Sequence, residues 1–264
     1  MRRSASLAVC LALLAIGVVA GPAGAVTGGE PDGNRHPNVG ALLAGTSGVD
    51  MFQLCSGSLI APGEFLTAGH CTDFLAGNPG FVVSVSFEEN LNLDPDTGVL
   101  APATTVAATG SSTMPGFKAG IAKSINDVGV VHLAQPVTGR APVGLPAEGL
   151  LGATALQGHV FTNVGYGIDA LDRSILSKEA TVISDGRRTV GTSRFKSLTP
   201  YFLKQQGGIC FGDSGGPHFW SATGPLRNLT VAVTSATNPT CGTLAENQRL
   251  DTPEVVAFLA DFLP

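Results

Sequence analysis

Short apolar and β-branched runs, separated by turns that contain glycine or proline, recur along this chain and limit what it can fold into. The 264 residues include 35 glycines and 17 prolines, and neither residue is well tolerated inside a helix. Runs of this length between turn residues are typical of strands. The clearest of them cover residues 81–87, 128–133, 156–165 and 229–235. The pattern predicts an all-β fold.

A helical pattern of useful length appears first at the C-terminus. Thr252 can cap a helix, Pro253 suits its first turn, and Glu254 interacts favourably with the helix dipole. Apolar residues follow with helical spacing at Val255, Val256, Phe258, Leu259 and Phe262. We therefore expect one helix at the C-terminal end of a β protein.

Residues 1–25 have the organisation of a secretory signal peptide. Arg2 and Arg3 form the charged start, residues 7–20 the apolar stretch, and residues 23–25 an A-x-A cleavage site. The apolar stretch is too short for a good membrane span. Cys10 lies inside this stretch and should leave with it. We expect a secreted, extracellular protein with no membrane partner once the signal peptide is removed.

Charge excludes some partners. Loss of Arg2 and Arg3 leaves 13 of the 15 basic residues against 20 acidic ones, a net charge of about −7. Nucleic acids and anionic membranes both require clustered lysine and arginine. The chain should therefore bind no nucleic acid. Separately, its mature length of 239 residues is ample for a large core.

Ser214 is the candidate nucleophile. The glycines around it let the backbone turn so that the N–H groups of Gly212 and Ser214 could point at one oxygen, which is the requirement for an oxyanion hole. The same residues fit the G-x-S-x-G elbow of the α/β-hydrolases. That fold places the acid and the histidine after the serine, but only His218 follows Ser214, four residues on. The general base must therefore lie upstream.

His70, beside Cys71, is the best candidate for that base. His132 lies in an apolar run that predicts a strand, and His36 and His159 lie in glycine- and proline-rich or strand-edge contexts. A serine base also needs an orienting group. Asp127 opens a β-branched run, so a rigid strand can carry its carboxylate into the interior. An aspartate before a strand is otherwise a common turn residue.

Four sequence blocks together resemble the chymotrypsin-like (trypsin-fold) serine proteases, in the manner of a secreted bacterial-type member. They surround His70, Asp127, the tripeptide 165–167 and Ser214, and they occur in the family's order. The resemblance runs from about Val26 to the C-terminal helix. It implies a general base at His70, its orienting acid at Asp127, a nucleophile at Ser214 and an oxyanion hole at Gly212 and Ser214. Gly69 departs from the family's usual alanine.

The resemblance also implies the architecture. Two antiparallel six-stranded β-barrels would enclose the active site in the cleft between them. Residues 26–135 would form the N-terminal barrel, with His70 and Asp127, and residues 136–264 the C-terminal barrel, with Ser214 and the helix. Together, residues 26–264 would make one peptidase domain.

Four cysteines remain after Cys10 is lost. They allow three pairings, and their spacing does not choose among them. The resemblance implies Cys55 with Cys71, clamping the loop of His70, and Cys210 with Cys241, tying the serine loop to a neighbouring strand. Each bond would stabilise the fold by about 2–4 kcal/mol whatever the function.

Specificity is expected to be for neutral residues of small to medium size before the cleaved bond. In trypsin-like members an aspartate six residues before the nucleophile pairs with lysine or arginine, but that position here is Gly208. An unpaired ammonium is costly to bury. The wall segment 234–237, which contains Ser235, Ala236 and Thr237 after Thr234, departs from the family's usual Ser-Trp-Gly. Glu246 could reach the pocket from the other side.

Val26 begins directly after the predicted cleavage site, and residues 26–29 are similar to the amino terminus that family members expose on activation. By this resemblance the Val26 ammonium would pair with Asp213.

Residues 88–96 are rich in oxygen ligands and resemble a calcium loop of some members, but we expect a solvated acidic loop, no metal and no cofactor. We expect a monomer that acts on proteins or peptides. The alternative is an inactive binding or adhesion module of the same fold.

Overall fold

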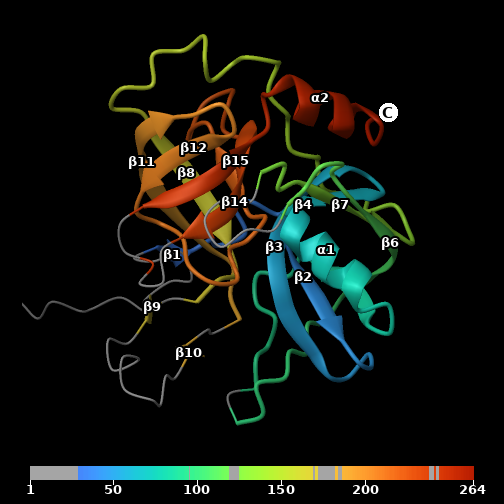
Figure 1. Ribbon diagram of the computed structural model, residues 1–264. Coiled ribbons are helices and arrows are strands. Elements are labelled where there is room, and N and C mark those ends of the chain that lie inside the picture. The colour runs from blue at the N-terminus through green and yellow to red at the C-terminus, as the bar shows by residue number, and fades with distance from the viewer. Residues whose placement is uncertain are drawn as a thin grey trace, which may run out of the picture.

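The computed structural model of the protein describes residues 29–94, 96–118, 125–168, 170–171, 182–183, 186–237, 241 and 244–264. Two antiparallel barrels of six strands lie side by side, the first in blue to green and the second in yellow to red in Figure 1. The predicted all-β class with two barrels and a C-terminal helix is confirmed. The last strand of the first barrel ends at Leu133 and the first strand of the second begins at Val160.

The first barrel has six strands: β2 (Val39–Gly45), β3 (Met51–Ala61), β4 (Glu64–Thr67), β5 (Val82–Ser86), β6 (Val106–Thr113) and β7 (Gly129–Leu133). Their order is β2-β3-β4-β7-β6-β5, and β2 closes the barrel by pairing with both β3 and β5. Leu42, Leu59 and Phe65 are fully buried in its interior. Residues 82–86 and 129–133 lie inside two of the runs predicted as strands.

The second barrel is formed by β8 (Val160–Gly165), β11 (Thr189–Leu198), β12 (Phe202–Gln206), β13 (Pro217–Phe219), β14 (Thr230–Thr237) and β15 (Ala245–Arg249). The order β11-β12-β15-β14-β13-β8 closes because β8 also pairs with β11. The short strand β1 (Glu30–Pro31) adds to the edge at β11, and β9 (Ala170–Leu171) pairs with β10 (Val182–Ile183).

The predicted C-terminal helix is present as α2 (Pro253–Ala260), and the hydroxyl of Thr252 accepts a hydrogen bond from Val255 N as its cap. Val255 and Leu259 are buried in the core cluster that includes Leu66 and Val130 of the first barrel. The last helix of the chain therefore packs back onto the first barrel (Figure 1). The C-terminal helix of the chain thus connects to the first barrel.

A second helix, α1 (Gly69–Gly77), was not predicted. It follows β4 directly and buries Cys71, Thr72 and Leu75. Nine residues with so few apolar side chains carry little periodicity to detect. Its position is fixed by contacts from outside the helix: a Cβ at Gly129 would lie 2.5 Å from Thr72 Oγ1, so β7 approaches the helix through a glycine.

Candidate active site

His70 and Asp127 meet at the end of the first barrel. His70 is the second residue of α1, and Asp127 lies two residues before the start of β7. The His70 ring nitrogen Nδ1 lies 2.9 Å from Asp127 Oδ2, and the His70 backbone N donates to Asp127 Oδ1 at 2.7 Å. An ionised carboxylate only accepts hydrogen bonds, so Nδ1 carries the proton of the neutral ring. The other ring nitrogen, Nε2, is then a free base.

The Asp127 carboxylate is fully buried and receives support from the second barrel as well. Ser235 Oγ donates to Asp127 Oδ2 at 2.5 Å, and Gln248 Oε1 accepts from Asp127 N at 3.1 Å. A buried carboxylate with several donors is held in one orientation. Asp127 is therefore fixed by both barrels, whereas the His70 side chain keeps 33% of its surface exposed.

The serine loop lies against the segment that leads to His70. Ser56 N donates to Ser214 O at 2.8 Å, and Gly215 N donates to Thr234 O at 2.8 Å. Gly215 has φ +79°, and a Cβ there would lie 2.5 Å from Ala68 N. Only glycine permits this approach. No hydrogen bond between the Ser214 hydroxyl and His70 occurs among the described residues, and catalytic contacts of this kind often tighten only with substrate.

Two backbone amides beside Ser214 point away from the protein's own acceptors. Phe211 O accepts from Ile168 N at 2.9 Å, and Asp213 O accepts from Gly216 N at 2.8 Å. In a trans peptide the N–H points opposite to the carbonyl, so these bonds turn the N–H groups of Gly212 and Ser214 outward. Within the described part of the chain, neither N–H has an acceptor. The pair can therefore donate to an oxyanion.

Gly212 is held in place by side chains that sequence reasoning missed. Its φ is +92°, and its carbonyl accepts from Gln53 Nε2 at 2.9 Å and from Ser56 Oγ at 2.8 Å. The same Ser56 hydroxyl accepts from Tyr166 N at 3.0 Å. Ser56 thus connects the first barrel to both the serine loop and residues 165–167. A lone serine in a strand gives no sequence signal of such a role.

Asp213 is buried beneath the same loop. Its carboxylate accepts from Gly167 N and Cys210 N, each at 2.9 Å. Gly165 and Gly167 are glycines because the carboxylate fills the space of a side chain at both: a Cβ would approach it to 2.2 Å at Gly165 and 2.5 Å at Gly167. The predicted partner of Asp213, Val26, lies outside the described residues.

Tyr166, between those glycines, is anchored by a buried ion pair. Arg188 Nε lies 3.0 Å from Asp32 Oδ2, with both side chains fully buried, and Arg188 Nη1 donates to the Tyr166 hydroxyl at 3.1 Å. Burial raises the pKa of Tyr166 to about 12, although Arg188 opposes the shift. Burial also raises the pKa of Asp32, but hydrogen bonds from His36 and the charge of Arg188 bring it down to about 2.

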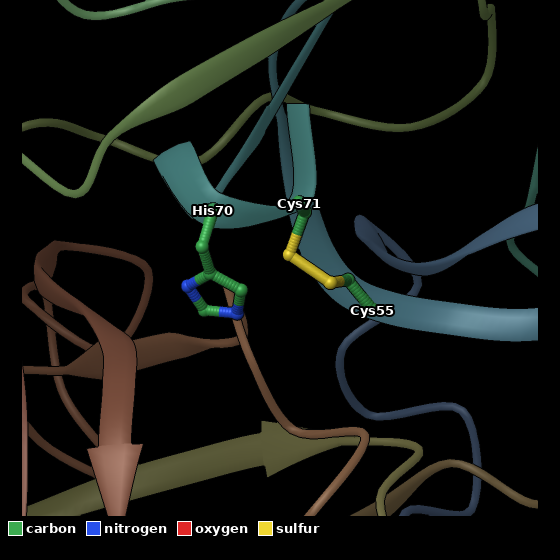
Figure 2. Close-up of side chains that lie close together, drawn as sticks. All are labelled: Cys55, His70 and Cys71. Atoms are coloured by element: carbon green, nitrogen blue, oxygen red, sulfur yellow. A yellow bond between two sulfur atoms is a disulfide. The ribbon is translucent and has the colours of Figure 1, made fainter. Parts of the chain in front are cut away.

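The disulfides join Cys55 to Cys71 and Cys210 to Cys241, the pairs that the family resemblance implied. Figure 2 shows the first of them beside His70: Cys71 points to Cys55, and the ring of His70 points toward the ribbon of the second barrel. The bond ties the start of α1 to β3 and so restrains the backbone that carries the ring. Cys10 lies outside the described residues.

The residues predicted to line the specificity pocket separate into two groups. Gly208 is buried with φ +87°, and Ala236 and Thr237 end β14. The Ser235 side chain instead points to Asp127. The suggestion that Glu246 enters the pocket is wrong: its carboxylate pairs with Lys204 Nζ at 2.5 Å on the outer face of β12 and β15, because strand alternation turns its neighbours Ala245 and Asn247 inward.

The other histidines have structural surroundings. His36 Nδ1 lies 2.5 Å from Asp32, and His159 Nε2 lies 2.8 Å from Trp220 O. His132 lies in β7, as predicted for a strand, and forms a second serine–histidine–carboxylate chain: Ser112 Oγ is 2.9 Å from Nε2, and Glu64 Oε2 is 2.7 Å from Nδ1. This hydrogen-bonded group lies on one sheet face without a glycine-rich turn. It therefore provides a control for the candidate group of Ser214, His70 and Asp127.

Within the described ranges, the group of three or more potential metal ligands that lie close together is Cys55, His70 and Cys71, whose sulfurs form the disulfide. In the acidic segment 88–96, Glu88 Oε1 accepts from Thr104 Oγ1, and Glu89 Oε1 accepts from Gly33 N. Both carboxylates therefore have a hydrogen-bond partner within the protein. No helix in the described part of the chain is long and apolar enough to cross a membrane.

Comparisons with known proteins agree with this geometry. The sequence model of the trypsin family matches residues 25–248. Brachyurin of Leptuca pugilator is 31% identical over 220 residues, covering 80% of this chain and 85% of the relative. The cercarial protease of Schistosoma mansoni is 31% identical over 191 residues, covering 67% and 69%. These relatives are a crustacean and a trematode protein, so they do not support the bacterial type suggested by the sequence.

Among solved structures, human heparin binding protein has a TM-score of 0.64 at 17% identity, covering 90% of this chain and 96% of its own. At that identity the likeness concerns the fold alone. The match to the family model covers most of the chain and includes every residue of the candidate site. The chain therefore belongs to the trypsin family of serine proteases.

Proposed function

We propose that this protein is a secreted serine endopeptidase that uses Ser214, His70 and Asp127 as a catalytic triad. The observation that carries the proposal is the outward-turned pair of N–H groups at Gly212 and Ser214, next to a histidine whose Nδ1 is held by a buried carboxylate. Donors fixed before the substrate arrives stabilise charge that develops in the transition state. A module that only binds protein has no need for them.

The chemistry follows from the positions of these groups. His70 Nε2 takes the proton of the Ser214 hydroxyl as its oxygen attacks the scissile carbonyl. The carbonyl oxygen becomes an oxyanion that accepts from Gly212 N and Ser214 N. Collapse of this intermediate expels the amine, which receives the proton from His70, and leaves an acyl-enzyme on Ser214. Water, deprotonated by His70, then releases the acid.

Substrates are proposed to carry a neutral residue before the cleaved bond. Gly208 contributes no charge, and Glu246 is already paired with Lys204 on the outer face of the barrel. An unpaired lysine or arginine side chain would lose its hydration without gaining a counter-ion. Peptides that differ only at this position test the point, and a preference for lysine or arginine would contradict it.

Signal peptidase is proposed to create the active form directly. Removal of residues 1–25 leaves Val26 as the amino terminus, and its ammonium would pair with Asp213, whose carboxylate lies buried under the serine loop. Breaking such a buried pair costs about 3–5 kcal/mol. A variant with one extra residue before Val26 should therefore lose most of its turnover. N-terminal sequencing of the secreted protein and assay of the extended chain test this step. A mature chain that starts well downstream of Val26, or full activity of the extended chain, would refute it.

The triad is tested by Ser214→Ala and His70→Ala, which should each lower turnover by about 10⁴–10⁶-fold without additivity in the double variant. A fluorophosphonate should label wild-type protein stoichiometrically and leave Ser214→Ala unlabelled. Ser112→Ala and His132→Ala are matched controls, because they remove a hydrogen-bonded serine and histidine that lie outside the proposed triad. Retention of a tenth of the activity by Ser214→Ala would disprove the assignment, and absence of any labelling would favour the inactive module.

A further inference from the structure

A closed belt of uncharged polar side chains surrounds the interior of the second barrel. Each of its six strands contributes one residue, and all are buried, with at most 4% of their surface exposed. In strand order around the barrel they are Ser193, Gln205, Asn247, Thr234, His218 and Asn163. Inward positions of a small barrel are ordinarily apolar, so a complete polar ring is unexpected for packing alone.

Three hydrogen bonds join the belt in pairs. Ser193 Oγ donates to Asn163 Oδ1 at 3.1 Å, and Asn247 Nδ2 donates to Gln205 Oε1 at 2.8 Å. The third pair is His218 Nε2 with Thr234 Oγ1, 3.0 Å apart. These pairs account for only part of the hydrogen-bonding capacity of the six side chains.

Four polar atoms of the belt have no hydrogen-bond partner among the described residues: Asn163 Nδ2, Gln205 Nε2, His218 Nδ1 and Asn247 Oδ1. They include donors and an acceptor. A buried polar atom left without a partner is costly, and native proteins keep few of them unless something else supplies the bond. Four in one ring indicate that a polar ligand atom, from water or substrate, completes the ring.

The belt carries no charge at working pH. Burial lowers the pKa of His218 to about 3, although the nearby Asn247 amide opposes the shift without forming a bond of normal geometry. His218 therefore stays neutral in neutral solution. The ion pair between Lys204 of β12 and Glu246 of β15 lies on the outer face. The belt offers hydrogen bonds but no counter-ion to a charged side chain.

The belt lies directly beneath the serine loop. Thr234 O accepts from Gly215 N, and Thr234 N donates to Gly216 O at 3.0 Å, so the residues after Ser214 are bonded to a belt position. A Cβ at Gly208 would lie 2.6 Å from Asn163 Nδ2. In the loop that precedes Ser214, the backbone of Gly208, which has no side chain, therefore lies close to Asn163 Nδ2, a donor without a partner among the described residues. Ser235 and Gln248, which directly follow the belt residues Thr234 and Asn247 in the sequence, form hydrogen bonds with Asp127.

From this placement we infer that the belt forms the floor of the substrate pocket, and that it selects an amide side chain, glutamine or asparagine, before the cleaved bond. An amide offers one acceptor and one donor group, which match the free donors of Asn163 and Gln205 and the free acceptor of Asn247. An aliphatic side chain would leave these atoms without partners. A carboxylate would face Asn247 Oδ1, and an ammonium would face Asn163 Nδ2.

This inference rests on the proposed peptidase function, and the experiment separates the two. The secreted wild-type protein is first titrated with a fluorophosphonate. It is then assayed on one peptide sequence in which the residue before the scissile bond is glutamine, asparagine, leucine, alanine, glutamate or lysine. We expect kcat/KM for the amide peptides to exceed the others by about 10²-fold or more, because a site built for hydrogen bonds rejects analogues that lack them.

Asn163→Asp replaces the free donor with an oxygen at nearly constant size. It should remove most of the amide preference and raise the relative rate on lysine, while labelling of Ser214 persists. Asn38→Asp is the matched control, because Asn38 is also a buried asparagine but bonds Ala141 O and Asn228 outside the belt. If Asn163→Asp fails to fold, Thr234→Val, which removes the partner of His218, should lower the preference instead.

Labelled wild-type protein that cleaves leucine or alanine peptides as fast as amide peptides would overturn this inference and leave the peptidase function standing. An amide preference that survives unchanged in the folded belt variants would overturn it too. Protein that neither labels nor cleaves would overturn the peptidase function and this inference together.

Discussion

Replacing Ser56 with alanine should lower both stability and turnover, because its hydroxyl holds two backbone groups of the proposed active site. It donates to Gly212 O at 2.8 Å and accepts from Tyr166 N at 3.0 Å. After the change, Tyr166 N loses its partner in a buried setting, at a cost of about 1–3 kcal/mol. Gly212 O keeps its bond from Gln53, so the second loss is smaller. A chain of this size should melt about 2–4 °C lower for each kcal/mol.

The effect on turnover is smaller than deletion of an oxyanion donor, which costs about 10²–10³-fold. Ser56→Ala removes no donor and loosens one of two holds on Gly212. We therefore expect a loss of about 10-fold in kcat, equivalent to about 1.4 kcal/mol. The assay is steady-state hydrolysis of a peptide ester and a peptide amide, normalised to the fraction of Ser214 that reacts with a fluorophosphonate.

Ser58→Ala is a matched control on the same strand. Ser58 is also fully buried, but its hydroxyl has no partner among the described residues. Removing this hydroxyl should leave turnover unchanged and stability unchanged or slightly higher. On folding, the hydroxyl loses its hydrogen bonds to water and gains none within the described part of the protein. Equal losses in the two variants, or wild-type kcat in Ser56→Ala, would refute the role given to Ser56.

Two further predictions concern the surroundings of the site. Gly165→Ala should lower the fraction of reactive Ser214, because its Cβ would lie 2.2 Å from Asp213 Oδ1 and displace that carboxylate; active-site titration measures the fraction. Acid unfolding should depend on Asp32, whose pKa is about 2 in the folded protein, where hydrogen bonds from His36 and the charge of Arg188 outweigh burial. A depressed carboxyl pKa contributes stability above its unfolded value, so about 2 kcal/mol should disappear as pH falls from about 4 to 2, and Asp32→Asn should flatten that part of the curve.

Each of these two predictions has a matched control variant. Gly63→Ala adds a methyl group where nothing lies within 4 Å, so the reactive fraction should not change. Asp73→Asn removes an exposed carboxyl and should leave the acid limb of the stability curve as it is in wild type. Loss of active sites in Gly63→Ala, or an acid limb that is the same in Asp32→Asn and wild type, would contradict the explanations given.

The parts of the fold that sequence predicts well are those with local signals. Thr252 and Pro253 specify the start of α2, and the β-branched run before Leu133 specifies β7. Helix α1 has no comparable signal, since its position depends on Gly129 in a strand that is distant in sequence. The registers that close each barrel likewise depend on pairings between distant segments, such as β2 with β5. Local patterns do not encode such pairings.

The same division holds at the site. Residues proposed for a distinctive chemical role, such as His70 and Ser214, stand out because few residue types can do that chemistry. Ser56 and Gln53 act only through long-range hydrogen bonds to Gly212. Serine and glutamine occur in many strands without such a role. Glu246 was misjudged for the opposite reason, because a charge attracts attention in a sequence while strand alternation decides which way it points.

The proposed active site is shared between the barrels in a way that links its two halves. Asp127 belongs to the first barrel but is held by Ser235 and Gln248 of the second. Gly212 belongs to the second barrel but is held by Ser56 of the first. A small shift of one barrel against the other would therefore strain the orientation of His70 and of the oxyanion donors at the same time. Because the bonds cross in both directions, substitutions at the barrel interface far from Ser214 should lower kcat before they lower the affinity for substrate.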